Sequence, residues 1–250
     1  MPRYIHLTET ASTNSYLAGT AHVLPGGTVI YTFRQTAGRG QKGNHWESQD
    51  NKNLTFSMLL KDTGVEAAQQ FCISEAVALA IVDVLQEHAG AGFSIKWPND
   101  IYYHDSKICG LLIENSLRGT SIEHSVVGVG LNINQLQFVS DAPNPISLSL
   151  ITGQEYNLEQ LLHEVCQHME LACDALKQEQ ARHDMHQDYL KALYRNDGAQ
   201  HPFARPDGTQ FMASIVDVAP DGLLTLRHSD GSLHGYAFRE VKHVIDQRIL

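Results

Sequence analysis

Residues 96–100, Lys-Trp-Pro-Asn-Asp, form the segment whose residue types are best suited to chemistry on a charged substrate. A strand-like stretch, 93–97, ends beside the proline and passes directly to Asn99 and Asp100. Such a segment can place a carboxylate at the end of a sheet, although Asn and Asp also initiate ordinary turns. Taken alone, the run favours a turn, and a chemical role depends on what lies near it.

A glycine-rich segment imitates a dinucleotide-binding fingerprint. Gly38, Gly40 and Gly43 satisfy G-x-G-x-x-G and follow an apolar run, 28–33, that is typical of a strand. The fingerprint also requires a helix at the third glycine, because the helix N-terminus holds the pyrophosphate. Here a polar, non-periodic stretch follows, and then a second strand-like run at 54–60. We therefore expect a loop between two strands that holds an anion with backbone N–H groups and with the cations Arg39 and Lys42.

Two later segments carry weaker signals. Lys107 follows a polar turn and precedes an apolar strand, a setting in which most lysines are solvated. In residues 128–134, apolar side chains alternate with glycine and asparagine, which predicts one buried face and one face of small or polar residues. Glycines on one face of a strand indicate either the close approach of a ligand or another backbone, or a bulge.

The elements that must position these residues predict a mixed domain. A hydroxyl of Ser12 or Thr13 is suited to cap a short helix. The apolar spacing within 67–88 predicts a helix that ends at Gly90, and Asn157 with Gln160 resembles a helix cap at the start of another; a further helical stretch is expected near 186–194. Short polar connections separate strand-like runs at 93–97, 101–103, 110–114 and 125–133, which favours antiparallel pairing.

The character of the chain changes after Arg195. Asp-Gly pairs at 207–208, 221–222 and 230–231 are turn signals between short β-type runs, at 211–218, 223–227, 233–238 and 241–245. We expect a small all-β appendage, SH3-like in form, with a boundary that divides the chain into residues 1–196 and 197–250.

Composition limits the classes of function. The formal net charge of −10, from 28 acidic and 18 basic residues, argues against a surface for nucleic-acid backbones. No run approaches the roughly 20 apolar residues of a membrane span, and the first residues lack the apolar core of a signal peptide, so we expect a cytoplasmic protein without a membrane partner. The four cysteines form no C-x-x-C pair, and His183 with His186 lacks the further ligands that a closed zinc site needs.

Each signal is weak alone, but their order resembles one family closely. The successive motifs are similar to those of biotin protein ligases from residue 8 to about residue 135: Ser12-Thr13-Asn14, Gln35-Thr36-Ala37-Gly38-Arg39-Gly40, Trp46, Lys96-Trp97-Pro98-Asn99-Asp100, Lys107-Ile108-Cys109-Gly110 and Gly128-Val129-Gly130-Leu131-Asn132-Ile133-Asn134. The resemblance continues weakly to the carboxyl end, where Phe238-Arg239-Glu240-Val241 has Arg239 at a position where glycine is frequent.

The resemblance implies an α+β fold: a mixed, mostly antiparallel sheet flanked by helices, similar to class II aminoacyl-tRNA synthetases, with an SH3-like β-barrel at the carboxyl end. It also implies a two-step reaction. The biotin carboxylate attacks the α-phosphorus of ATP to give biotinyl-5′-AMP and pyrophosphate, and a lysine of a biotin carboxyl carrier protein then takes the biotinyl group.

The resemblance also assigns residues to roles. Lys107 and Arg39 would supply the cations that a carboxylate needs to approach a triphosphate, and Asp100 would help to organise a Mg²⁺ on ATP. Biotin would contact Ser12, Thr13, Asn14, Gln35, Gly38, Arg39, Gly40, Lys107 and Gly110. ATP or the adenylate would contact Arg39, Gly40, Gln41, Lys42, Gly43, Trp46, Trp97, Asn99, Asp100 and Asn132, the last at adenine or phosphate.

The chain departs from the family pattern at Gln41, where many members carry arginine, so that Lys42 or Arg39 would have to compensate. Some relatives carry a winged helix-turn-helix ahead of the catalytic domain, but the first motif here begins at residue 8, which implies a monofunctional ligase that binds no DNA. The family includes monomers and dimers, so a homodimer stays open. The alternatives are a lipoate ligase or octanoyltransferase, which shares the architecture, and a non-catalytic biotin or nucleotide sensor.

Overall fold

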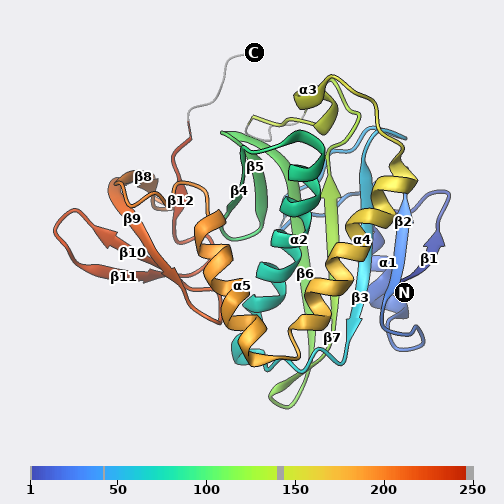
Figure 1. The fold of residues 1–250 in the computed structure, drawn as a ribbon, viewed down its shortest axis with the longest axis horizontal. Helices are drawn as coiled ribbons and strands as arrows, with labels where there is room; N and C mark the ends of the chain where they lie inside the picture. Colours follow the sequence, from blue (N-terminus) through green and yellow to red (C-terminus); the bar gives the residue numbers. More distant parts are fainter. Residues whose placement is uncertain (1, 42, 140–143, 246–250) are drawn as a thin grey trace.

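The computed structural model describes residues 2–41, 43–139 and 144–245, and it consists of a large sheet covered by helices with a second sheet beside it (Figure 1). The large sheet has seven strands in the order β1-β2-β3-β7-β6-β5-β4. Its members are β1 (Arg3–His6), β2 (Thr28–Thr32), β3 (Leu54–Lys61), β4 (Phe93–Lys96), β5 (Asp100–Tyr103), β6 (Ser106–Arg118) and β7 (Ser121–Leu131). β1 and β2 are parallel and every other neighbouring pair is antiparallel, which confirms the mixed, mostly antiparallel sheet.

The strands at the centre of this sheet are longer than their sequence pattern indicated. β6 and β7 form a long hairpin whose turn contains Gly119 with a φ of +65°, a conformation that glycine adopts without strain. β7 is paired on its other side with β3, from Leu54 opposite Leu131 to Lys61 opposite His124. Because β7 is paired on both sides, it extends into the polar residues near the hairpin turn. A search for hydrophobic alternation does not identify those residues as part of a strand.

Helices cover both faces of the large sheet. α2 (Phe71–Ala89), α4 (Leu158–Ala175) and α5 (Glu179–Ala192) lie together on one face (Figure 1), where the main core contains Val77 and Ile81 of α2. α1 (Thr13–Thr20) packs on the other face, because Leu17 meets strand side chains that alternate with those of the main core. Within the described ranges, no helix has the length and apolar character to cross a membrane.

The helix predictions hold in part. Gly90 ends α2 with a φ of +73°, and the Asn157 side chain accepts from the Gln160 N–H at the start of α4, as expected. α5 begins at Glu179, well before the predicted start near 186. The sequence pattern did not show this start, because Tyr189 is the one buried residue of α5 and the helix has little apolar periodicity. The 3₁₀ turn η1 (Ala67–Gln69) and the short α3 (Leu148–Thr152) were not predicted as separate elements.

The second sheet has five strands in the order β11-β10-β9-β8-β12. They are β8 (His201–Ala204), β9 (Gln210–Val218), β10 (Leu224–His228), β11 (Leu233–Tyr236) and β12 (Lys242–His243), all paired antiparallel. The three Asp-Gly turns are present, with Gly208, Gly222 and Gly231 all at positive φ. β8 was missed, because it is short and contains Pro202.

The second sheet contacts the large one through a few specific groups. The indole N–H of Trp97 donates to the carbonyl of Gly222 at 3.0 Å, and the ring of Phe238 lies against Trp97 with 5.3 Å between centroids. His186 of α5 lies between two carboxylates, Glu75 of α2 at 2.8 Å and Asp217 of β9 at 3.0 Å. These contacts fix the second sheet relative to the strand that leads into residues 96–100.

Candidate functional site

A cavity whose empty space, open solvent included, is about 700 Å³ lies between the glycine-rich loop, the start of α1 and strands β5, β6 and β7. Most of the residues predicted from the sequence line it. They are Ser12, Thr13, Asn14, Gln35, Arg39, Gly40, Gln41, Trp46, Asn99, Asp100, Lys107 and Gly110. Segments up to about 100 residues apart in the chain therefore meet at one cavity, as the family pattern implies.

The first turn of α1 supplies a network of polar groups at one end of the cavity. Ser12 caps the helix, and the backbone N–H of Thr13 donates to the side-chain oxygen of Gln35 at 3.0 Å. The amide of Asn14 donates to the carbonyl of Leu112 at 2.9 Å. Because these groups are buried and already oriented, they can bind a small polar ring without further ordering.

Ser57 completes this network and was not among the predicted site residues. Its hydroxyl lies 2.8 Å from the hydroxyl of Thr13 and 2.5 Å from Oδ1 of Asn14. Ser57 is a polar residue within an otherwise apolar part of β3, and it pairs with Gly128 across the sheet. The available signal was a polar residue in an apolar strand, and it becomes meaningful only when the strand pairing places Ser57 opposite Gly128.

The glycines of β6 and β7 make room for two side chains. A Cβ at Gly128 would lie 2.0 Å from Oδ1 of Asn14, and one at Gly130 would lie 2.3 Å from the indole of Trp46. Gly110 is similarly close to the same indole, at 2.9 Å. The close approach predicted at these glycines is thus present, but the groups that approach them are the side chains of Asn14 and Trp46 rather than a ligand. No register irregularity occurs at Gly128 or Gly130 in the pairing of β7.

Lys107 and Asp100 form an ion pair at the floor of the cavity. Their Nζ and Oδ1 atoms are 2.6 Å apart, and both side chains are mostly buried. Lys96 lies 3.9 Å from the other oxygen of Asp100. Burial lowers the pKa of the Lys96 ammonium below its ordinary value, with Asp100 opposing the shift and Lys107 adding to it. The two lysines thus place positive charge on both sides of one carboxylate.

Arg39 reaches from the glycine loop to β6. Its guanidinium donates to Glu114 at 2.8 Å and to the hydroxyl of Ser15 at 2.9 Å. Glu114 also accepts from the Asn14 amide, so this carboxylate joins the loop to the start of α1. The sequence analysis missed Glu114. An acidic residue in the apolar run of β6 was the available signal.

A second, smaller cavity adjoins the first and shares His45, Trp46 and Lys107 with it. Asn132 lines this cavity and is buried. Its Nδ2 donates to the carbonyl of Ile146 at 3.1 Å, while its buried Oδ1 has no hydrogen-bond partner within the described part of the chain. Lys107 therefore lies where two cavities meet, one polar and one with an unpaired acceptor.

The comparisons with known proteins agree with this geometry. Residues 7–132, half of the chain, match the model of the biotin/lipoate A/B protein ligase family. The chain belongs to this family. A biotin–acetyl-CoA-carboxylase ligase of Paracoccus denitrificans is 32% identical over 162 residues, which cover 62% of this chain and 67% of that protein.

A bifunctional ligase/repressor BirA of Bacillus subtilis is 33% identical over 147 residues, or 54% of this chain. The chain spans 44% of the length of that relative. Among solved structures, a biotin protein ligase from Aquifex aeolicus in complex with biotin and ATP superposes with a TM-score of 0.80 at 23% identity, and the match covers 98% of this chain and 100% of that one. This family member therefore shares the fold over both of its sheets.

Among the described residues, four predicted ones lie outside the lining of the main cavity: Asn132, which lines the smaller cavity, Trp97, Gly38 and Gly43. Trp97 is buried behind it and bonds to Gly222 of the second sheet, so its predicted contact with the nucleotide has no support in this arrangement. Gly38 is packed against Trp46, where a Cβ would lie 2.5 Å from its carbonyl oxygen. Gly43 turns the loop with a φ of +89°, and Lys42 lies outside the described residues.

His183 and His186 of α5 do not belong to a metal centre within the described residues. In the described residues no group of three or more His, Cys, Asp or Glu side chains could hold a metal ion. His186 instead joins Glu75 to Asp217, as described above. Burial lowers the pKa of His186, but its hydrogen bonds to the two carboxylates outweigh that effect and raise the pKa above the ordinary value.

Proposed function

We propose that the protein is an ATP-dependent biotin protein ligase. It activates biotin as biotinyl-5′-AMP and transfers the biotinyl group to a lysine of a biotin carboxyl carrier protein, that of acetyl-CoA carboxylase or of a related biotin-dependent carboxylase. Membership of the family supports this proposal, and so do the named relatives. The observation that carries it is the position of Lys107, whose ammonium group lies where the two cavities meet and is held by Asp100 at 2.6 Å.

Lys107 is the cation that the first step requires. A carboxylate oxygen attacks the α-phosphorus, the bond between that phosphorus and the bridging oxygen of the β-phosphate breaks, and pyrophosphate leaves. The two reacting groups are both anionic, so an ammonium between them lowers the free energy of the transition state. Asp100 holds this ammonium in place, and Arg39 adds a second cation at the rim.

The polar end of the first cavity is suited to the ureido ring of biotin. A ureido group offers two N–H donors and one carbonyl acceptor, and a buried ring of this kind must have all three satisfied. Thr13, Asn14 and Ser57 present hydroxyl and amide groups within one hydrogen-bonded cluster. We propose that biotin exchanges partners within this cluster, and that its carboxylate then points toward Lys107.

The second cavity is suited to the adenine base. The amide of Asn132 is oriented by its bond to Ile146, which leaves Oδ1 as an acceptor with no hydrogen-bond partner among the described residues. An acceptor repels a phosphate oxygen but pairs with the exocyclic amine of adenine. Of the two roles predicted for Asn132, we therefore propose contact with adenine.

Mg²⁺ belongs to this proposal as part of the ATP complex. Asp100 is one carboxylate beside the cavity, and its two oxygens face lysines in this arrangement. When bound, the ion would neutralise phosphate charge, and Asp100 is the residue of this chain that would help to hold it. We also propose that residues 1–196 form the catalytic domain, related to class II synthetases, and that residues 197–250 form an SH3-like domain.

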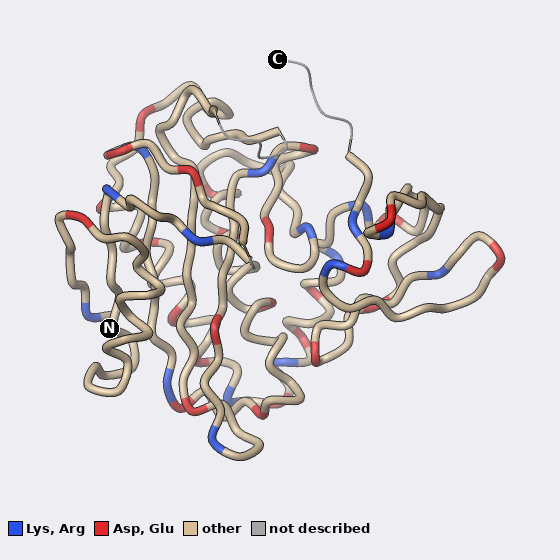
Figure 2. Tube along the Cα trace, turned by 180° about the vertical axis from the view of Figure 1, so that it is seen from behind, with Lys and Arg blue, Asp and Glu red and all other residues tan. Residues whose placement is uncertain are grey.

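Nucleic acid is left out of this proposal. Lys and Arg positions are interspersed with Asp and Glu positions along the described part of the trace (Figure 2). The net charge of −10 points in the same direction. The absence of a DNA partner, the cytoplasmic location and the choice between monomer and homodimer stay predictions from the sequence.

Exchange of labelled pyrophosphate into ATP tests the proposed first step. Purified protein with Mg²⁺ would be assayed with biotin, with lipoate and with no acid. We expect exchange that depends on biotin and is lost in Lys107→Ala, whereas Lys191→Ala, which removes an exposed lysine of α5, retains it. Exchange with lipoate alone would assign the chain to the lipoate branch of the family, and no exchange with either acid would favour a sensor.

The second step needs its own assay. Biotinyl-5′-AMP would be supplied to the protein with a biotin carboxyl carrier domain, and the mass of the carrier would be followed. We expect an increase by one biotinyl group, absent when the acceptor lysine of the carrier is replaced by arginine. If the mass of the carrier does not change, the proposed activity is limited to formation of the adenylate.

A further inference from the structure

A tight turn between β11 and β12 of the second sheet lies against the catalytic part of the molecule. In this turn, residues 237–240, the N–H of Ala237 donates to the side chain of Glu240 at 2.8 Å, and the N–H of Glu240 donates back to the carbonyl of Ala237 at 3.1 Å. The ring of Phe238 packs on Trp97, which precedes Asn99 and Asp100 of the cavity. The turn is therefore fixed relative to the site by its own hydrogen bonds and by an aromatic contact.

Arg239 extends from this turn to the glycine-rich loop. Its guanidinium donates to the carbonyl of Gln41 at 3.0 Å, across 198 residues of sequence. The same carbonyl accepts from the N–H of Asn44 at 3.2 Å, and the N–H of Gly40 donates to the carbonyl of Asn44 at 2.8 Å. Arg239 thus binds the loop at the residue where it turns, and Gln41 itself lines the cavity.

The backbone of Arg239 is in a conformation that favours glycine. Its φ is +74°, in the left-handed region where a side chain is strained. Arginine at this position makes the folded protein less stable than glycine would, so we look for a function of its side chain that offsets the lost stability. One contact of that side chain is its hydrogen bond to the Gln41 carbonyl of the glycine loop.

The charge of the cavity indicates what this role is. Arg39 and Lys107 line the cavity and are the cations of its described lining, and each is paired with a carboxylate: Arg39 with Glu114 at 2.8 Å and Lys107 with Asp100 at 2.6 Å. A triphosphate adds several negative charges at this place. Position 41 of the loop is a neutral glutamine, so the loop carries no fixed charge there.

We propose that Arg239 is a positioning residue for the nucleotide: it holds the Gln41 turn of the glycine loop over the triphosphate and brings a guanidinium charge from the second sheet to the rim of the cavity. This inference rests on the proposed function for its substrate. It makes the second sheet a part of the ATP site, and it assigns to a residue near the carboxyl end the charge that position 41 lacks.

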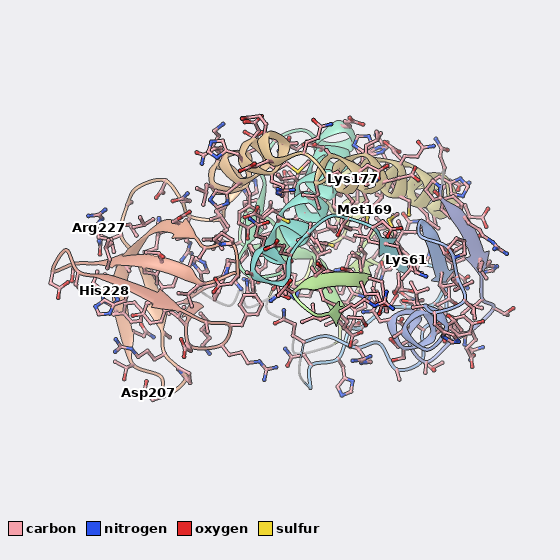
Figure 3. The ribbon with its side chains drawn as sticks, turned by 90° about the horizontal axis from the view of Figure 1, so that it is seen from below. Lys61, Met169, Lys177, Asp207, Arg227 and His228 are labelled. Carbon is pink, nitrogen blue, oxygen red and sulfur yellow. The ribbon has the colours of Figure 1, made fainter. Side chains whose placement is uncertain are left out.

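Arg239→Gly tests the inference directly, because glycine suits the backbone conformation and removes only the side chain. The matched control is Arg227→Ala, which removes one positive charge from an exposed residue of the second sheet (Figure 3). Affinity for Mg·ATP would be measured by calorimetry with and without biotin, together with KM and kcat for ATP in pyrophosphate exchange, the affinity for biotin and the melting temperature.

We expect Arg239→Gly to weaken ATP binding by about 5- to 10-fold, the effect of one partly exposed hydrogen bond from a charged donor. Its affinity for biotin should stay within about twofold of the unmodified protein, and its melting temperature should not fall, because strain at φ +74° is relieved. A residue with a merely structural role would lower the melting temperature and leave ATP affinity unchanged. Arg227→Ala should match the unmodified protein.

Two results would overturn the inference: unchanged ATP affinity in Arg239→Gly, or an equal loss in Arg227→Ala, which would indicate a long-range charge effect. These results are separable from a failure of the proposed function. If the unmodified protein shows no biotin-dependent exchange but its ATP affinity depends on Arg239, the biotin ligase assignment is wrong and the inference stands. If exchange is present and ATP affinity does not depend on Arg239, only the inference is wrong.

Discussion

Gly128→Ala is the substitution whose effect follows most directly from the packing of the site. The added Cβ would lie 2.0 Å from Oδ1 of Asn14, far inside van der Waals contact, so Asn14 has to leave its position. Asn14 then loses its bonds to Leu112 and Glu114 and its contact with Ser57, which are 2.9, 3.0 and 2.5 Å long. The backbone of β7 cannot move instead, because it is paired on both sides.

The magnitude follows from these three bonds. Two neutral hydrogen bonds contribute about 1 kcal/mol each and one to a carboxylate about 1.5–3 kcal/mol, which gives a loss of about 3–5 kcal/mol in the free energy of unfolding. For a protein of this size, that corresponds to a decrease of roughly 10 °C in melting temperature. Affinity for biotin should fall as well, since Asn14 belongs to the proposed ureido site.

Gly19→Ala is the matched control, because it makes the same chemical change in α1, a few residues from Asn14. Gly19 is exposed, has a helical φ, and would place its Cβ in open space. Alanine in a helix is favoured over glycine by roughly 0.5–1 kcal/mol, so this variant should be slightly more stable than the unmodified protein. Urea unfolding and biotin calorimetry would measure both effects. Neutral surface substitutions change the free energy of unfolding by about 0.5 kcal/mol or less. A change that small in Gly128→Ala, together with normal biotin binding, would refute the packing argument.

Three further predictions concern charge, nucleotide selection and pH. Asp100→Asn removes the partner that holds Lys107, so pyrophosphate exchange should slow by roughly 100-fold; the melting temperature should fall too, because Lys96 and Lys107 lose the carboxylate between them, and unchanged exchange would contradict the role of the pair. Asn132→Ala should raise KM for ATP about tenfold and leave KM for biotin unchanged in the same assay, whereas a rise in both would place Asn132 elsewhere. Burial raises the pKa of Glu75 above 4.5, and the carboxylates around His186 raise its pKa above 6.5, so in both cases the folded state binds the proton more tightly than the unfolded state. The stability that this pair contributes is therefore present at low pH and is lost as the pH rises from about 4.5 through the folded-state values. Urea unfolding between pH 5 and pH 8.5 should show a loss with rising pH that is smaller in Glu75→Gln, and equal slopes would refute the linkage.

The sequence predicted the parts of the fold that depend on local pattern. The apolar spacing of α2, the Asn157 cap and the alternation in residues 128–134 all appear as expected, because each is determined by neighbours within a few positions. α5 and β8 were wrong or missed, since α5 buries only Tyr189 and β8 is held by its partner strand β9. Elements that depend on distant partners leave little periodicity in the sequence.

The same distinction applies to the site. Lys107, Asp100 and Asn14 were identified because the family motifs contain them. Glu114 and Ser57 were not, since each acts through a contact with α1 that spans at least 43 residues. Motifs record residues that recur together along the chain, and contacts between the strands and α1 appear only when the sheet register is known.

The run at 96–100 has two functions that its sequence alone could not separate. Asp100 lines the cavity with its carboxylate between Lys96 and Lys107, while Trp97 contacts the second sheet, with its N–H on Gly222 and its ring on Phe238. One short segment therefore holds the Asp100 carboxylate on one side and the carboxyl-terminal turn on the other. Because Arg239 follows Phe238 directly and binds the glycine loop, that turn contacts the cavity at two places: the strand end that carries Asp100 and the loop that covers it. A displacement of the second sheet would move both together, so its contribution to nucleotide binding should be lost as a unit when Trp97 or Phe238 is replaced by a smaller side chain.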